Sequence, residues 1–131
     1  VGMDTHAIAH LKLLINLASI DHEVSDRERD YIFNIGRANG LAQAAVEPLF
    51  ERHHQMNIPP ALSPQEKFDF LFSLVQLMKI DEKLYRDEIR YCSQVAARLG
   101  FPHEVLFELM LEVKEPTDEA IKSALRRKLN G

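Results

Sequence analysis

Apolar residues recur at intervals of three and four along most of this chain, which is the spacing of one buried face of an α-helix. These runs alternate with short polar stretches rich in Gly, Pro, Ser and Asp. The pattern predicts an all-α bundle of about seven helices. The expected helices cover about residues 5–20, 26–39, 43–54, 64–80, 86–99, 102–114 and 117–129.

Several of these helices have specific capping signals at their ends. Ser25 and Glu28 match a capping box, in which the hydroxyl accepts a bond from a first-turn amide and the glutamate bonds back to the Ser25 amide. The run 63–66, Ser-Pro-Gln-Glu, starts another helix with an N-cap serine and a proline at the first helical position. Gly40 and Gly100 stand where a left-handed residue commonly ends a helix.

The expected helix over residues 64–80 is apolar around nearly its whole circumference. Only Asp69, Ser73 and Gln76 form a narrow polar strip along it. A helix that is apolar almost all round is typically buried at the centre of a bundle. We therefore expect this helix to lie in the middle of the fold.

The chain matches itself when it is shifted by sixty positions, without a gap. The identical pairs are Leu14/Leu74, Leu17/Leu77, Ile20/Ile80, Asp21/Asp81, Glu28/Glu88, Tyr31/Tyr91 and Gly40/Gly100. The shift predicts a duplicated helix–loop–helix unit, with copies over about residues 5–54 and 64–113 and an added C-terminal helix over about 117–129. Cys92 falls on Ile32, a core position, which predicts a buried and inert thiol.

Two of the identical pairs are polar and flank the loop within each unit. A core explains the apolar identities, but it does not explain Asp21/Asp81 or Glu28/Glu88. Asp commonly bonds backbone amides in turns, and Glu28 completes a capping box, so a purely structural role is one interpretation. In the second unit Tyr85 replaces the capping serine, so Glu88 lacks that explanation. The other interpretation is that the four carboxylates bind a hard cation.

These junctions resemble the family of the tellurite-resistance protein TerB and the TerB-like domains. That family has an apolar helix ending in Ala-x-x-Asp-Gly-x-[Ile/Val], followed two or three residues later by a Glu that opens the next helix, twice per domain. Residues 18–24 with Glu28, and residues 78–84 with Glu88, are similar to the two copies. The resemblance spans roughly residues 11–113, although the family glycine is His22 in the first copy and Glu82 in the second.

The resemblance implies a bundle of about seven helices and a non-enzymatic cytoplasmic protein of bacterial tellurite and chemical-stress resistance. It also implies a divalent metal, such as calcium, magnesium or zinc, with the four carboxylates as candidate ligands, or an interaction with a protein partner. By this resemblance, the candidate metal residues are Asp21, Glu28, Asp81 and Glu88.

Composition and charge limit the number of domains, the binding partners and the cellular location that are expected. The 131-residue chain favours a single domain over residues 1–131. The net charge of −4 argues against nonspecific binding to nucleic acid or to anionic membrane. No apolar run approaches the ~20 residues of a membrane span, and a signal-peptide pattern is missing, so a cytoplasmic protein without membrane insertion is expected. The single cysteine fits a reducing compartment.

Other chemical motifs in the chain are incomplete. The loops after Asp21 and Asp81 lack the glycine and the final glutamate that an EF-hand requires. Glu51-x-x-His54 is only half of a di-iron signature. His6 and His10 are four residues apart and could share a metal, but no third ligand is evident, so we expect them in a solvated helical turn. No phosphate-binding loop or nucleophile motif occurs, so no enzyme is predicted. The alternative to the cation-binding hypothesis is a structural interaction module without a metal site.

Overall fold

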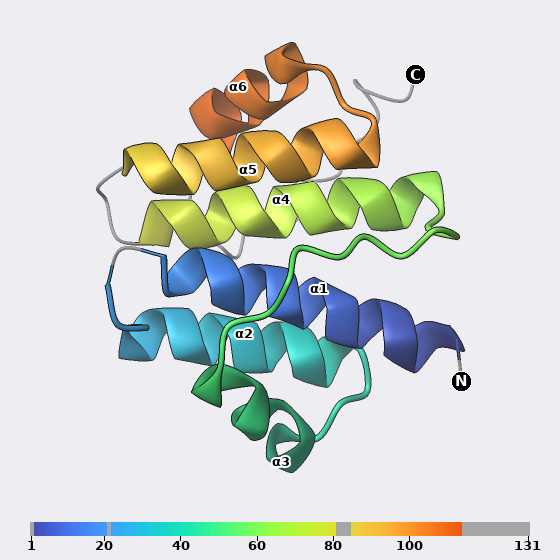
Figure 1. Ribbon diagram of the computed structural model, residues 1–131, viewed down its shortest axis with the longest axis vertical. Coiled ribbons are helices and arrows are strands. Elements are labelled where there is room, and N and C mark those ends of the chain that lie inside the picture. Colours follow the sequence, from blue (N-terminus) through green and yellow to red (C-terminus); the bar gives the residue numbers. More distant parts are fainter. Residues whose placement is uncertain (1, 21, 81–84, 114–131) are drawn as a thin grey trace.

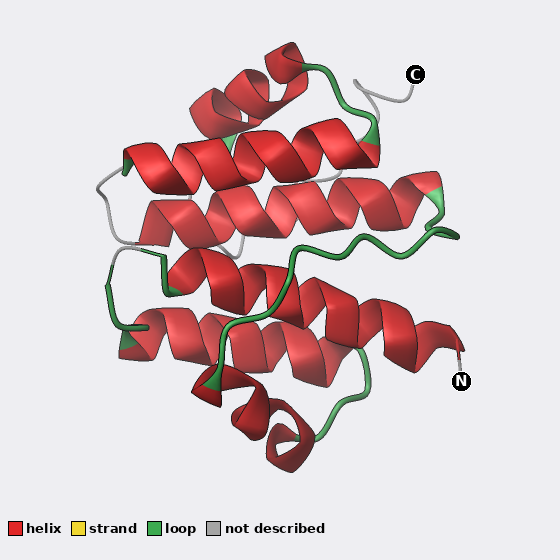
Figure 2. Cartoon of the chain, viewed as in Figure 1, coloured by secondary structure: helices red, strands yellow, loops and turns green. Residues whose placement is uncertain are grey.

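The computed structural model describes residues 2–20, 22–80 and 85–113 of the chain (Figure 1). Within these ranges the chain forms six α-helices and one 3-10 helix and contains no β-strand (Figure 2). They are α1 (Gly2–Ala18), α2 (Asp26–Ala38), α3 (Gln43–Val46), η1 (Glu47–Glu51), α4 (Pro64–Ile80), α5 (Arg86–Leu99) and α6 (His103–Glu112). The all-α prediction is confirmed, and the helix expected over 117–129 lies outside the described residues.

The helices lie side by side in the order α3, α2, α1, α4, α5 and α6, so that α1 and α4 occupy the middle (Figure 1). These two helices run in the same direction. His6 Nδ1 lies 2.8 Å from Glu66 Oε2, and the ring of His10 stacks on Phe70 with centroids 4.3 Å apart. Residues sixty positions apart in the sequence therefore face one another along the central helix pair.

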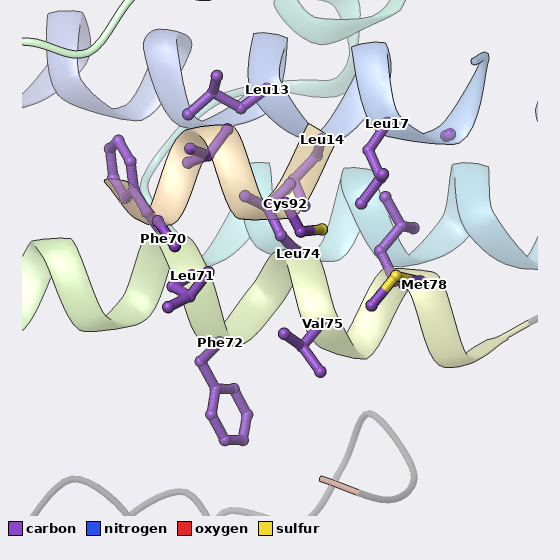
Figure 3. Close-up of a cluster of buried hydrophobic side chains, with 14 of the residues drawn as sticks. Leu13, Leu14, Leu17, Phe70, Leu71, Phe72, Leu74, Val75, Met78 and Cys92 are labelled. Carbon is purple, nitrogen blue, oxygen red and sulfur yellow. The ribbon is translucent and has the colours of Figure 1, made fainter. Parts of the chain in front are cut away.

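The hydrophobic core lies between the central helices and their neighbours. Leu13, Leu14 and Leu17 of α1 come from one side, and Leu71, Leu74 and Met78 of α4 from the other (Figure 3). The prediction that the 64–80 helix is buried is confirmed, since eleven of its residues are buried. Among the described helices, none combines the length and the apolar character needed to cross a bilayer.

Polar residues on the central helices bond across the bundle instead of facing water. Ser73 and Gln76, expected on a polar strip of the 64–80 helix, are both buried. Gln76 Oε1 accepts a 2.6 Å bond from the Tyr31 hydroxyl, and Ser73 Oγ bonds His10 Nε2. The expectation of a solvated turn around His10 was wrong, because this ring is buried against α4.

Asn16 of α1 makes the corresponding polar contact on the other side of the bundle. Its Nδ2 donates to the Tyr91 hydroxyl at 3.1 Å, and Tyr91 lies on α5. Asn16 and Gln76 are sixty positions apart, as are Tyr31 and Tyr91. The two central helices thus reach the two flanking helices through tyrosines at matching positions.

The predicted caps are present at α2 and α4. Ser25 Oγ accepts from the Glu28 amide at 3.2 Å while Glu28 Oε1 accepts from the Ser25 amide at 2.9 Å. Ser63 and Glu66 make the same reciprocal pair before α4, at 3.1 and 2.9 Å. At α5 the N-cap residue is Tyr85, and its side chain makes no capping bond. This agrees with the prediction, since a tyrosine replaces the capping serine of the first unit.

The expected helix over residues 43–54 is the main departure from the predicted elements. The chain forms only four α-helical residues there and then continues as the 3-10 helix η1 until Glu51. Pro48 explains the change, because a proline has no amide to donate back to residue 44 and its ring crowds that carbonyl. A 3-10 turn accommodates this loss in a short segment.

The stop of α5 depends on Gly100, which adopts φ +91°. The Gly100 amide bonds Ala97 O, and the Phe101 amide bonds Ala96 O at 2.9 Å, as in a Schellman motif. Replacing Gly100 with alanine is expected to lower the free energy of unfolding by about 1–2 kcal/mol, because an L side chain disfavours this conformation. Nothing lies within 4 Å of the added Cβ, so backbone strain alone is responsible.

Urea denaturation of the Gly100→Ala variant measures this effect. Gly100→Asn is the matched control, since asparagine tolerates the left-handed region better than alanine. An asparagine variant that is no more stable than the alanine variant would contradict the conformational explanation.

Candidate functional site

Two glutamates from distant parts of the sequence meet on one side of the bundle. Glu28 and Glu88 occupy the third positions of α2 and α5, and each is only 2% exposed. Both lie near the imidazole of His22, which belongs to the segment between α1 and α2. Arg27 Nη1 also donates to Ile80 O at 3.4 Å, so the α1–α2 junction lies beside the end of α4. The fold therefore places the two matching glutamates in a shared, water-poor site.

His22 lies between the two carboxylates. Its Nε2 is 3.3 Å from Glu88 Oε2, and its Nδ1 is 3.9 Å from Glu28 Oε1. Nδ1 also lies 2.7 Å from the carbonyl oxygen of Glu23, to which it can donate when protonated. Both ring nitrogens thus face oxygen acceptors. A neutral imidazole can donate from only one nitrogen, so this environment favours the doubly protonated cation.

The electrostatics of the site agree with this geometry. The bond to the Glu23 carbonyl raises the pKa of His22 above its ordinary value of 6.5, and the charges of Glu28 and Glu88 raise it further. Partial burial opposes these effects without cancelling them. With His22 protonated, the cluster of His22, Glu28 and Glu88 holds one positive and two negative formal charges.

The two glutamates differ in what else holds them. Glu28 is fixed by its capping box with Ser25. Glu88 has no such box, because Tyr85 occupies the capping position and its ring instead lies 5.7 Å from the ring of His22. The same carboxylate therefore has a capping function in the first half of the chain and not in the second.

Cys92 lies one turn after Glu88 on α5 and is fully buried. Burial, and then the negative charge of Glu88, raise the pKa of the Cys92 thiol far above its usual range. A thiol held protonated is a poor nucleophile and a poor metal ligand. The prediction that Cys92 is a buried residue of the core is confirmed (Figure 3).

The described part of the predicted cation site does not form a metal site by itself. Of the four candidate carboxylates, Glu28 and Glu88 are brought together, while Asp21 and Asp81 lie outside the described residues. Among residues 2–20, 22–80 and 85–113, no three His, Cys, Asp or Glu side chains are arranged to hold a metal ion. A role for Asp21 and Asp81 as further ligands stays a prediction.

The sequence interpretation missed His22 as a member of this site. In the sequence, His22 stands out only because it occupies the position of the glycine in TerB-like junctions. The available signal was the pair Glu28/Glu88 itself, since two carboxylates buried near each other require a compensating charge. Within the first junction, His22 is the residue that supplies that charge.

The raised pKa of His22 predicts a pH-dependent stability. Because the folded-state pKa lies above the unfolded value, the contribution is fully present below about pH 6.5 and is lost as the pH rises through the folded pKa. We expect the free energy of unfolding to fall from pH 6 towards pH 9, and His22→Gln to lack most of this slope. Urea unfolding across this range, with an NMR titration of the ring, measures both quantities.

His53→Gln is the control, because His53 is exposed and belongs to a different part of the fold. It should leave the slope unchanged. An NMR pKa for His22 at or below 6.5 would contradict the bridging role of the imidazolium.

Comparison of the chain with known protein families, with curated proteins and with solved structures finds no match in any of the three. The resemblance of the two junctions to TerB-like domains, which includes Asp21/Asp81 and Glu28/Glu88, therefore stays a prediction from the sequence.

Proposed function

We propose that this chain is a non-enzymatic, TerB-like helical domain built from a duplicated unit, and that its two junctions together form one divalent-cation site. The observation that carries the proposal is the meeting of Glu28 and Glu88, two buried carboxylates at matching positions, around a single imidazole. The same sixty-residue relation in His6–Glu66, His10–Phe70 and the two tyrosine contacts supports the duplication.

The donor set favours a metal that accepts both oxygen and nitrogen. Glu28 and Glu88 supply carboxylate oxygens, and His22 supplies an imidazole once it has lost its proton. Calcium and magnesium prefer oxygen ligands alone, whereas zinc accepts imidazole and carboxylate together. In this proposal Asp21 and Asp81 complete the ligand set, and zinc binds more tightly than calcium or magnesium.

An NMR titration of the whole chain with zinc, magnesium and calcium tests the site. Saturating zinc should shift amides over residues 21–28 and 81–88, and the combined Asp21→Asn and Asp81→Asn variant should lose these shifts. A control with Glu47→Gln and Glu51→Gln removes two exposed acidic charges elsewhere and should bind as the unmodified chain does. If saturating metal moves no amide in either junction, the cation site is ruled out.

The second candidate is a helical interaction module without a metal. It is favoured because both carboxylates already have partners within the protein. Glu28 accepts the capping bond from Ser25, and Glu88 forms an ion pair with His22. It is also favoured by two large apolar side chains one turn apart on α6, Phe107 at 53% exposure and Leu111 at 80%. This candidate predicts no metal response and an unchanged fold in the double asparagine variant.

For either candidate, we propose that the protein acts in the bacterial cytoplasm in resistance to tellurite or chemical stress. It would act by binding a protein partner that is not identified. This part of the proposal is supported only by the resemblance of the junctions. Growth of a tellurite-sensitive bacterium that expresses the chain, compared with one that expresses the double asparagine variant, tests it. Equal sensitivity of both strains and of an empty-vector strain would contradict it.

A further inference from the structure

A cleft of about 790 Å³ lies between α1 and the segment that joins η1 to α4. That segment crosses the face of α1 in Figure 1. On the α1 side the cleft is lined by Thr5, Ile8, Ala9 and Lys12, which follow the helical spacing of a single face. The volume falls within the range of about 300–1,000 Å³ that is usual for small-molecule sites. The cleft shares no residue with the site around His22.

The wall formed by residues 52–60 is held in place by side chains from two helices. Asn16 donates to His54 O at 2.7 Å and accepts from the His54 amide at 3.0 Å. Arg98 Nη1 donates to Met56 O at 3.0 Å. A segment without regular structure is thus fixed at two points along its backbone. A preformed wall lowers the ordering entropy that a ligand must overcome on binding.

The lining combines an apolar floor with cationic groups. Ile8, Met56 and the buried Pro59 provide apolar surface. Lys12 and Arg52 provide two permanent positive charges, and no Asp or Glu occurs among the described lining residues. Within the described part of the chain, neither cation forms an ion pair. The chain as a whole has a net charge of −4, whereas the described lining of this cleft is positively charged.

Lys12 is half-buried and Arg52 is exposed, and both side chains line the cleft. Two positive charges beside one cleft attract an anionic group that enters it. From the anchored wall, the apolar floor and the two cations, we propose that this cleft binds a small organic anion: a carboxylate or a phosphate group carried on an apolar body. The anionic group lies between Lys12 and Arg52, and the apolar body lies along Ile8, Met56 and Pro59.

Calorimetry and NMR with the whole chain test this proposal with octanoate, octyl phosphate and octanol as probes. Octanoate or octyl phosphate should shift amides over residues 8–12 and 52–59, and the stronger of the two identifies the preferred anionic group. Octanol, which has the same apolar body without charge, should bind at least about fivefold more weakly. Inorganic phosphate alone should bind more weakly still, and raising the salt concentration should weaken both anionic probes.

The variant that combines Lys12→Met with Arg52→Gln should weaken the anionic probes about tenfold and leave octanol unchanged. Methionine keeps the apolar stem of Lys12, so the packing of α1 is retained. Arg90→Gln is the matched control, because it removes a positive charge from the exposed face of α5, and it should have no effect. Three outcomes would overturn the proposal. Octanol could bind as tightly as octanoate, or Arg90→Gln could weaken binding as much as the double variant does. The third is that no amide shifts at millimolar concentrations of the probes. None of these outcomes bears on the cation site, which is tested by metal titration.

Discussion

Replacing Leu74 with alanine is expected to lower the free energy of unfolding by about 3–5 kcal/mol. Leu74 lies on α4 at 0% exposure, in the middle of the cluster that joins α4 to α1 and α5 (Figure 3). The substitution removes buried apolar atoms and leaves a cavity that close-packed neighbours fill only in part. Urea denaturation followed by far-ultraviolet circular dichroism measures the change.

Two further variants define what this result means. Leu111→Ala is the control, because Leu111 is 80% exposed on α6 and should change stability by less than about 0.5 kcal/mol. Leu14→Ala removes the side chain at the matching position of α1, also at 0% exposure. If the α1–α4 contact forms one cooperative core, both core variants should lower the midpoint without changing the denaturant slope. A cost below about 1 kcal/mol for Leu74→Ala would contradict the central position of α4.

The second large effect is expected for Asn16→Ala, at about 2–3 kcal/mol of lost stability. The substitution leaves the amide and the carbonyl of His54 without their bonds to Asn16, and it removes a donor to the Tyr91 hydroxyl. Buried polar groups left without a partner cost more than the net value of the original bond. Hydrogen exchange of the His54 amide should become faster, and probe binding in the cleft should weaken, because residues 52–60 lose an anchor.

Asn34→Ala is the control for this variant, because Asn34 is exposed on α2. It should change stability by less than about 0.5 kcal/mol. An Asn16→Ala variant as stable as this control would show that water replaces the lost bonds at no cost. Loss of stability without any change in exchange at His54 would place the effect elsewhere in the core.

The sequence predicted the helices well wherever local signals and burial agreed. The capping boxes at Ser25 and Ser63 placed the starts of α2 and α4, and the run of apolar residues identified α4 as the central helix. Such features are local, because a cap depends on residues within one turn and an amphipathic face on residues within one helix. The prediction of one helix over 43–54 was wrong because Pro48 interrupts the α-helical hydrogen bonds, although the apolar spacing continues past it.

The polar contacts within the fold could not be predicted in the same way. His10, Ser73 and Gln76 have the composition of a solvated strip, and only the arrangement of the helices shows that they are buried. Glu28 and Glu88 both lie near the ring of His22, while the prediction that they are metal ligands stays untested. The position of His22 between them depends on how the first junction lies against α5, and no spacing along the chain encodes that distance.

The pairing of unlike central helices has a consequence for association between copies of this chain. α1 and α4 run in the same direction and meet at residues sixty apart, as partners in a parallel coiled coil do. In a dimer that paired α1 with α1 and α4 with α4, His6 would meet His6 and Glu66 would meet Glu66. The observed pairing instead joins His6 with Glu66 and His10 with Phe70. These complementary differences favour the pairing of α1 with α4 over the pairing of like helices.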